Sequence, residues 1–180
     1  MLNQSQREKL LEIARRSIEG RLKQSKIPDF SVTEPELREK RAAFVTLTKG
    51  GHLRGCIGYT EPIHPLHQTV ASCAVSAAFS DPRFPPLRAD ELPQVQIEIS
   101  VLTPIRKIQD ISEIQVGVHG LFITKGFHRG LLLPQVATEY GWDRETFLEQ
   151  TCYKAGLAAD AWRKGAEIYI FSAEIFHEQS

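Results

Sequence analysis

The stretch Phe44-Val-Thr-Leu-Thr-Lys-Gly-Gly-His-Leu-Arg-Gly-Cys-Ile-Gly-Tyr59 predicts a β-hairpin. Two runs of strand-forming residues, 44–48 and 53–59, flank a Lys-Gly-Gly-His turn, and Gly-Gly suits the tight turns of hairpins. Successive side chains of a strand point to opposite faces. One face of the second run therefore carries Leu53, Ile57 and Tyr59, which we expect in the core, and the other face carries His52, Arg54 and Cys56.

Cys56 is the first candidate for chemistry. A guanidinium beside a thiol favours the reactive thiolate, and Arg54 lies two residues from Cys56 on the same predicted face. Cysteine is also among the residue types most often buried, where it acts as a small apolar side chain. For Cys56 taken alone the structural interpretation is favoured, and both interpretations stay open at this point.

Composition bounds the class of protein. The 180 residues are 42% hydrophobic and 24% charged, which is typical of a globular domain. Lys+Arg and Asp+Glu both number 22, so we expect no nucleic-acid partner, although a local basic patch is compatible with a neutral average. No run approaches the ~18 apolar residues of a membrane span, and no secretory leader opens the chain, so we expect no membrane partner. The sparse, odd set of cysteines fits free thiols in a reducing compartment, and the expected location is cytoplasmic: Cys56, Cys73 and Cys152.

Helix and strand signals alternate along the chain. A capping box at Ser5–Glu8 predicts an amphipathic helix over about 6–23, which docks on its own domain or on a second subunit. Further helices are predicted over 66–79, after Pro134 and after Asp143. A second hairpin is expected over 120–133 and a last strand over 167–176. Mixed hairpins and helices predict an α+β fold, a mostly antiparallel sheet with flanking helices.

Residues 94–102 form the clearest strand, with apolar and polar side chains in alternation. If this strand shares a sheet with the first hairpin, one face is buried and the other is polar. The buried set is Val45, Leu47, Leu53, Ile57, Val95, Ile97 and Ile99. The polar set is Thr46, Arg54, Cys56, Glu98 and Ser100.

This polar face is the candidate ligand-binding site. Gly55 and Gly58 leave backbone open for a ligand or a bulge. Asp81 and Arg83, in a proline-stiffened loop, either pair or lean over the site. The plainer alternative is a solvated sheet face on which Arg54 and Glu98 form a cross-strand pair.

Histidines add one tentative catalytic candidate. His119 lies in the constrained turn Gly117-Val-His-Gly120, where an imidazole acts as an acid or base, or caps the hairpin. His64 and His67 have the spacing of a ligand pair but no partner motif, so we expect no metal. Residues 50–58 lack the ending of a phosphate loop, and we expect no cofactor.

A sequence similar to the turn of the first hairpin recurs later in the chain. Thr48-Lys-Gly-Gly-His-Leu-Arg-Gly55 is similar to Thr124-Lys-Gly-Phe-His-Arg-Gly130. The flanking segments do not match, so shared turn chemistry explains the similarity better than a duplication does.

Several motifs together resemble the AMMECR domain family. The resemblance runs in order from about Phe44 to Phe176 through Leu53–Gly58, Ala78–Pro86, Glu98–Pro104, Gly117–Leu121, Leu132–Ala137, Gly141–Trp142 and Cys152–Leu157. It implies one AMMECR-type domain over 1–180, with an N-terminal helix in 1–24 and the motif region in 42–176. It also implies a larger and a smaller lobe that form a cleft, and Gln135 in the Leu132–Ala137 motif joins the ligand-binding candidates.

The resemblance also implies partners. Microbial members occur beside, or fused to, a Memo-type protein and a radical S-adenosylmethionine enzyme. This chain lacks the three clustered cysteines of a radical iron–sulfur enzyme, so we expect a protein that binds an unknown small ligand or presents a substrate to such partners. The alternative is an enzyme with Cys56 as nucleophile, Arg54 supporting the thiolate, and His119 or Glu98 as acid–base partner. A nucleic-acid-associated factor is the second alternative.

Overall fold

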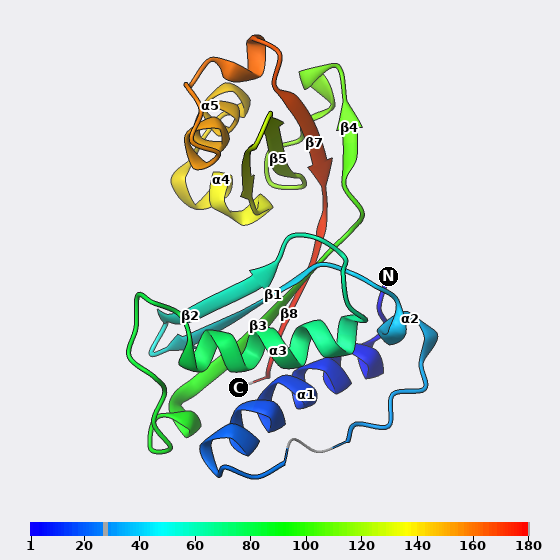
Figure 1. The fold of residues 1–180 in the computed structure, drawn as a ribbon, viewed down its shortest axis with the longest axis vertical. Helices are drawn as coiled ribbons and strands as arrows, with labels where there is room; N and C mark the ends of the chain where they lie inside the picture. Colours follow the sequence, from blue (N-terminus) through cyan, green and yellow to red (C-terminus); the bar gives the residue numbers. More distant parts are fainter. Residues whose placement is uncertain (27–28, 180) are drawn as a thin grey trace. The chain divides into compact units, whose positions relative to one another are not determined.

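The computed structural model describes residues 1–26 and 29–179, and the chain divides into two compact units (Figure 1). Unit 1 comprises Met1–Val101 and Glu174–Ser180, and unit 2 comprises Leu102–Ala173. Each unit has its own four-stranded sheet, and the assigned strand pairs are antiparallel. This confirms the predicted α+β class, while the implied cleft stays a prediction.

In unit 1, two long helices cover one face of a sheet. The strands are β1 (Ala43–Lys49), β2 (His52–Tyr59), β3 (Val95–Leu102) and β8 (Ala173–His177), in the order β2-β1-β3-β8. The helices are α1 (Gln4–Leu22), the short α2 (Pro35–Arg38) and α3 (Leu66–Phe79), with a 3-10 turn at Leu92–Gln94. Figure 1 shows α1 and α3 on the same side of this sheet.

Helix α1 begins two residues earlier than the sequence predicted. The capping box is formed by Asn3 and Gln6, each side chain accepting from the other residue's backbone N–H, and not by Ser5 and Glu8. The amphipathic pattern is confirmed, because Leu10, Ala14 and Ile18 are buried in the core of unit 1. Helix α1 therefore docks on its own unit, against α3.

The apolar face of the sheet lies against these helices. Strand β1 is central, and its Val45 pairs with Ile57 on β2 and with Ile99 on β3. Helix α3 contributes an apolar stripe, and all five of its members are buried: Leu66, Val70, Cys73, Ala74 and Ala77.

A bulge in β2 overturns one prediction. Leu47 pairs with Gly55 but Thr48 pairs with Leu53, so Arg54 is an extra residue in the ladder. The bulge shifts Leu53 onto the face of Thr48, where it is 42% exposed. The expectation of Leu53 in the core was wrong, because one inserted residue reverses the alternation. Tyr59 is also exposed, at the end of the strand.

Unit 2 repeats the layering with shorter elements. Its strands β4 (Arg106–Ile108), β5 (Gly120–Lys125), β6 (His128–Leu132) and β7 (Glu167–Phe171) have the order β4-β7-β5-β6. Its helices are α4 (Pro134–Tyr140) and α5 (Arg144–Lys154), with 3-10 turns at Ile111–Glu113 and Ala161–Arg163. Pro134 opens α4 and Asp143 caps α5, as predicted.

The predicted last strand over 167–176 is in fact two strands. Strand β7 ends at Phe171 and β8 begins at Ala173, and the two belong to different sheets. The side-chain pattern continues across Ser172, so alternation alone does not reveal the break. Among the described residues, none of the helices has the length and apolar character needed to cross a membrane.

Candidate functional site

A row of polar side chains crosses three strands of unit 1. Thr46 on β1 pairs with Cys56 on β2 and with Glu98 on β3, which places all three on the face opposite the core residues. Directly paired side chains of a sheet lie about 5 Å apart at Cβ. The Thr46 hydroxyl is 3.3 Å from the Cys56 sulfur, within hydrogen-bond range for sulfur, and Cys56 is partly exposed. We call Cys56, Thr46 and Glu98 the Cys56 row.

An ion pair anchors the backbone of Cys56. The Asp81 carboxylate accepts the Cys56 N–H at 3.0 Å and two bonds from the Arg83 guanidinium at 2.7 and 3.0 Å. These donors, the Arg83 side chain first, hold the pKa of Asp81 well below its usual range. Asp81 is buried, whereas the Arg83 side chain is 55% exposed. The pairing of Asp81 with Arg83 was one of two sequence alternatives.

The bulge residue Arg54 forms a second, deeper ion pair. Its Nε and Nη2 donate to the Glu91 carboxylate at 3.2 and 3.1 Å, and Nη2 also donates to the Pro85 carbonyl at 2.9 Å. Arg54 is 8% exposed. Hydrogen bonds from Arg54, then from the Arg88 N–H and Lys49, lower the pKa of Glu91 to about 2.

The guanidinium bound to residue 56 is therefore Arg83 and not Arg54. Arg83 Nη2 donates to the Cys56 carbonyl oxygen at 3.4 Å, while Arg54 donates to Glu91 and Pro85. The Phe84 ring contacts both cations, with its centroid 5.6 Å from the Arg83 guanidinium carbon and 5.9 Å from that of Arg54. Residues 81–91 thus bind β2 at two positions, Arg54 and Cys56.

Close packing explains both glycines of the motif. A Cβ at Gly55 would lie 2.0 Å from the Ala77 carbonyl oxygen, because α3 crosses the strand there. A Cβ at Gly58 would lie 2.3 Å from the ring of Phe44, its cross-strand partner. Ser100 also pairs with Phe44 and is buried. Protein atoms occupy the space beside both glycines, so their presence is explained without a ligand.

Two predicted site residues belong to unit 2. His119 Nδ1 accepts the Gln115 N–H at 3.1 Å in the turn before β5. Gln135 lies on α4, and its Oε1 atom is buried with no hydrogen-bond partner among the described residues. A catalytic pairing of Cys56 with His119 stays a prediction.

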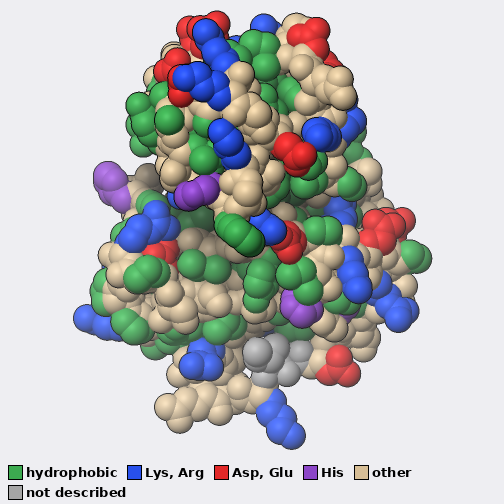
Figure 2. Space-filling view, turned by 45° about the horizontal axis from the view of Figure 1, so that its top comes forward, with side chains coloured by type: hydrophobic (Ala, Val, Ile, Leu, Met, Phe, Trp, Pro, Cys, Tyr) green, Lys and Arg blue, Asp and Glu red, His purple; other side chains and the backbone are tan. Residues whose placement is uncertain are grey.

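Sequence reasoning missed Glu91, Phe84 and Lys49. Glu91 is 37 residues from Arg54, and no local pattern connects the two. Figure 2 shows positive and negative side chains interspersed over the visible surface, which agrees with many such pairs. Among residues 1–26 and 29–179, no group of three or more His, Cys, Asp and Glu side chains is arranged to hold a metal ion. The His67 Nδ1 atom instead lies 3.0 Å from the Leu37 carbonyl oxygen.

Comparison with known proteins places this arrangement in a family. The AMMECR1 family model matches residues 11–176. A protein of Methanothermobacter thermautotrophicus is 49% identical over 94% of this chain and 92% of its own length. One of Methanosarcina barkeri is 46% identical over 94% of this chain and 88% of its own length. The crystal structure of an uncharacterized protein from Pyrococcus horikoshii is similar with a TM-score of 0.87 and 44% identity, covering 94% of this chain and 90% of that one.

Proposed function

Because the chain belongs to the AMMECR1 family, we propose that it binds a small ligand or substrate at the Cys56 row and works with partner enzymes. The partners are a Memo-type protein and a radical S-adenosylmethionine enzyme, and this part of the proposal is supported by the family resemblance alone. The cleft implied by the same resemblance belongs to the proposal.

The observation that carries the proposal is the polar, partly exposed thiol. The Cys56 sulfur contacts a hydroxyl and lies on the face of the sheet opposite the buried apolar residues. The other two thiols are buried, and burial raises the pKa of Cys73 to about 12. A thiol kept for packing has no need of a hydroxyl partner at a surface.

The electrostatics of the loop suggest the class of ligand. Arg83 is more than half exposed while two of its donors hold Asp81. A guanidinium fixed by one carboxylate presents its outer edge with little loss of side-chain freedom, and carboxylates and phosphates match its geometry. We therefore propose a small anion-bearing ligand.

Protection of Cys56 from alkylation tests this proposal. Native protein is treated with iodoacetamide, with and without a panel of inorganic phosphate, glycerol phosphate, malonate and citrate, and each cysteine is followed by mass spectrometry. We expect at least one anion to slow alkylation of Cys56 in a saturable way, and Arg83→Ala to abolish that protection.

Arg88→Ala is the matched control. Arg88 lies in the same loop, but its guanidinium binds Asp90 and not residue 56. Protection should survive in this variant. If no anion alters the rate at Cys56, or if Arg83→Ala and Arg88→Ala behave alike, the anion site is refuted.

A Cys56-dependent enzyme is the second candidate, favoured by the Thr46 hydroxyl 3.3 Å from the sulfur. An activated thiolate is alkylated near its maximal rate already at neutral pH, whereas an ordinary thiol reacts faster up to about pH 8.5 and above. A Thr46→Val variant removes the hydroxyl and keeps the shape. A profile that is ordinary in the wild type and unchanged in Thr46→Val would exclude the enzyme.

A further inference from the structure

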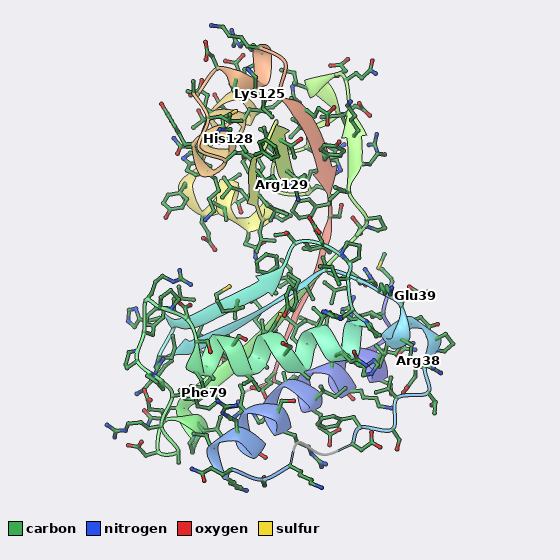
Figure 3. The ribbon with its side chains drawn as sticks, viewed as in Figure 1. Arg38, Glu39, Phe79, Lys125, His128 and Arg129 are labelled. Carbon is green, nitrogen blue, oxygen red and sulfur yellow. The ribbon has the colours of Figure 1, made fainter. Side chains whose placement is uncertain are left out.

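The tip of the β5–β6 hairpin in unit 2 exposes an aromatic ring among cations. The turn Lys125-Gly126-Phe127-His128-Arg129 leaves Phe127 104% exposed, and the four residues beside it are exposed as well. Gly126 has φ +61°, a left-handed conformation that a tight hairpin turn requires and glycine adopts freely. Figure 3 labels Lys125, His128 and Arg129, which come from β5 and β6.

The end of helix α5 extends this patch. A Cβ at Gly130 would lie 2.4 Å from the Ala155 backbone nitrogen, so β6 packs directly on the last turn of α5. The His128 ring lies beside Gly156. Residues 153–156 bring Lys154 and Tyr153, which is 59% exposed. We call residues 125–129 and 153–156 the hairpin-tip patch.

The charge of this patch differs from the neutral net charge of the whole chain. The patch holds three fixed positive charges, on Lys125, Arg129 and Lys154, together with His128, and its sequence contains no Asp or Glu. It holds two exposed aromatic rings. The nearest acids in sequence are Glu149 and Asp160, each four residues from the patch, and Asp160 forms an ion pair with Lys164.

The isolation of Phe127 distinguishes between kinds of partner. Its neighbours in the turn are Lys125, Gly126 and His128, all exposed, so no apolar side chain flanks the ring along the hairpin tip. Protein interfaces and membrane-surface anchors bury contiguous apolar patches. Stacking on a base needs only one accessible ring, and nearby cations then bind the phosphates.

We propose that the hairpin-tip patch binds single-stranded nucleic acid without sequence preference, with a base stacked on Phe127 and phosphates bound by Lys125, Arg129 and Lys154. The neutral net charge predicted no such partner, but it averages over the whole chain, whereas this patch concentrates cations on one tip. The site is separate from the Cys56 row and does not depend on it.

Fluorescence anisotropy with a labelled uridine oligonucleotide of about 20 residues, and with its thymidine DNA counterpart, tests the proposal. For three phosphate contacts, log K against log salt should fall with a slope of about −2. Phe127→Ala should weaken binding about tenfold with little change of slope, because it removes a stacked base. Lys125→Ala with Lys154→Ala should flatten the slope to about −0.7.

Controls come from the same unit. Tyr140→Ala removes another exposed ring, and Lys107→Ala another exposed cation, and both lie outside the patch. These variants should bind like the wild type. Phe127 makes no packing contact that its removal would disturb, and circular dichroism confirms that each variant is folded.

Three results would overturn the proposal. One is the absence of any anisotropy change at low salt. Another is equal binding by Phe127→Ala and wild type. The third is binding to phosphatidylserine vesicles that requires Phe127 while neither oligonucleotide binds, which would assign the patch to a lipid surface instead.

Discussion

The two hairpins of the molecule, β1–β2 in unit 1 and β5–β6 in unit 2, are built alike and differ by one residue. Each turn has the sequence Lys-Gly-X-His, and in each the lysine pairs with the histidine. In each, an arginine precedes a glycine that lies against the backbone of a helix: Gly55 against Ala77, and Gly130 against Ala155.

Compared with the second hairpin, the first has one inserted residue, Leu53, between the histidine and the arginine. It creates the bulge that leaves Arg54 without a ladder partner, 8% exposed and paired with Glu91. In the second hairpin Arg129 pairs regularly across from Thr124 and is exposed. One inserted residue thus moves an arginine from the surface into the interior. As a result the first hairpin is bound by residues 81–91 beside Cys56, whereas the tip of the second hairpin is exposed to solvent.

Filling the space at the two glycines should have the largest effect. Gly55→Ala and Gly130→Ala each place a methyl group against helix backbone, at 2.0 and 2.4 Å, which cannot move without shifting the helix. We expect each to lose about 3 kcal/mol of unfolding free energy in urea titrations. Gly51→Asn is the control, since nothing lies near a Cβ there and asparagine tolerates φ > 0. Losses no greater than that of Gly51→Asn would contradict the shared close approach.

Replacing the arginine of each hairpin compares the buried Arg54 with the exposed Arg129. Arg54→Gln leaves the partly buried Glu91 with Lys49 as its remaining cation, and we expect a loss of about 2 kcal/mol. Arg129→Gln, at an exposed position, should lose less than about 1 kcal/mol. Equal losses in urea titrations would show that the bulge has no energetic role.

Much of the fold is predictable because its signals are local. Alternation over 94–102, the Gly-Gly turn and the apolar stripe of α3 each need only neighbouring residues. The bulge at Arg54 depends on how two strands pair, and the Arg54–Glu91 bond on contacts between distant residues. Sequence alternation therefore placed Arg54 beside Cys56, whereas the structure has Arg83 there. The row of Thr46, Cys56 and Glu98 was predicted because cross-strand pairing without a bulge preserves alternation.

Deleting Leu53 should convert the first hairpin into the geometry of the second. Thr48 would then pair with Arg54, which would move its guanidinium to the face of Cys56 and away from Glu91. We expect a loss of about 1 kcal/mol, because the lost ion pair is partly offset by a regular ladder. Cys56 should also be alkylated faster at neutral pH, since an adjacent cation favours the thiolate.

The alkylation rates of Cys73 and Cys152 serve as internal controls for this variant. Both thiols are buried and should be as slow as in the wild type. Faster alkylation of all three would report loosening of the fold, and an unchanged rate at Cys56 would show that Arg54 does not reach the thiol.

Acid should weaken the first hairpin more than the second, and this is the smallest expected effect. The pKa of Glu91 is lowered from 4.5 to about 2 by Arg54 first, so its contribution is full above pH 4.5 and is lost as the pH falls toward about 2. Asp81, whose pKa is lowered chiefly by Arg83, acts in the same direction. Hydrogen exchange should therefore show the amides of β2 losing protection in this window before those of β6. Arg54→Gln should flatten the acid dependence at β2, because without Arg54 less of the Glu91 stabilisation is left to lose. If β2 and β6 lose protection together in the wild type, the ion pairs of Glu91 with Arg54 and of Asp81 with Arg83 do not stabilise the first hairpin.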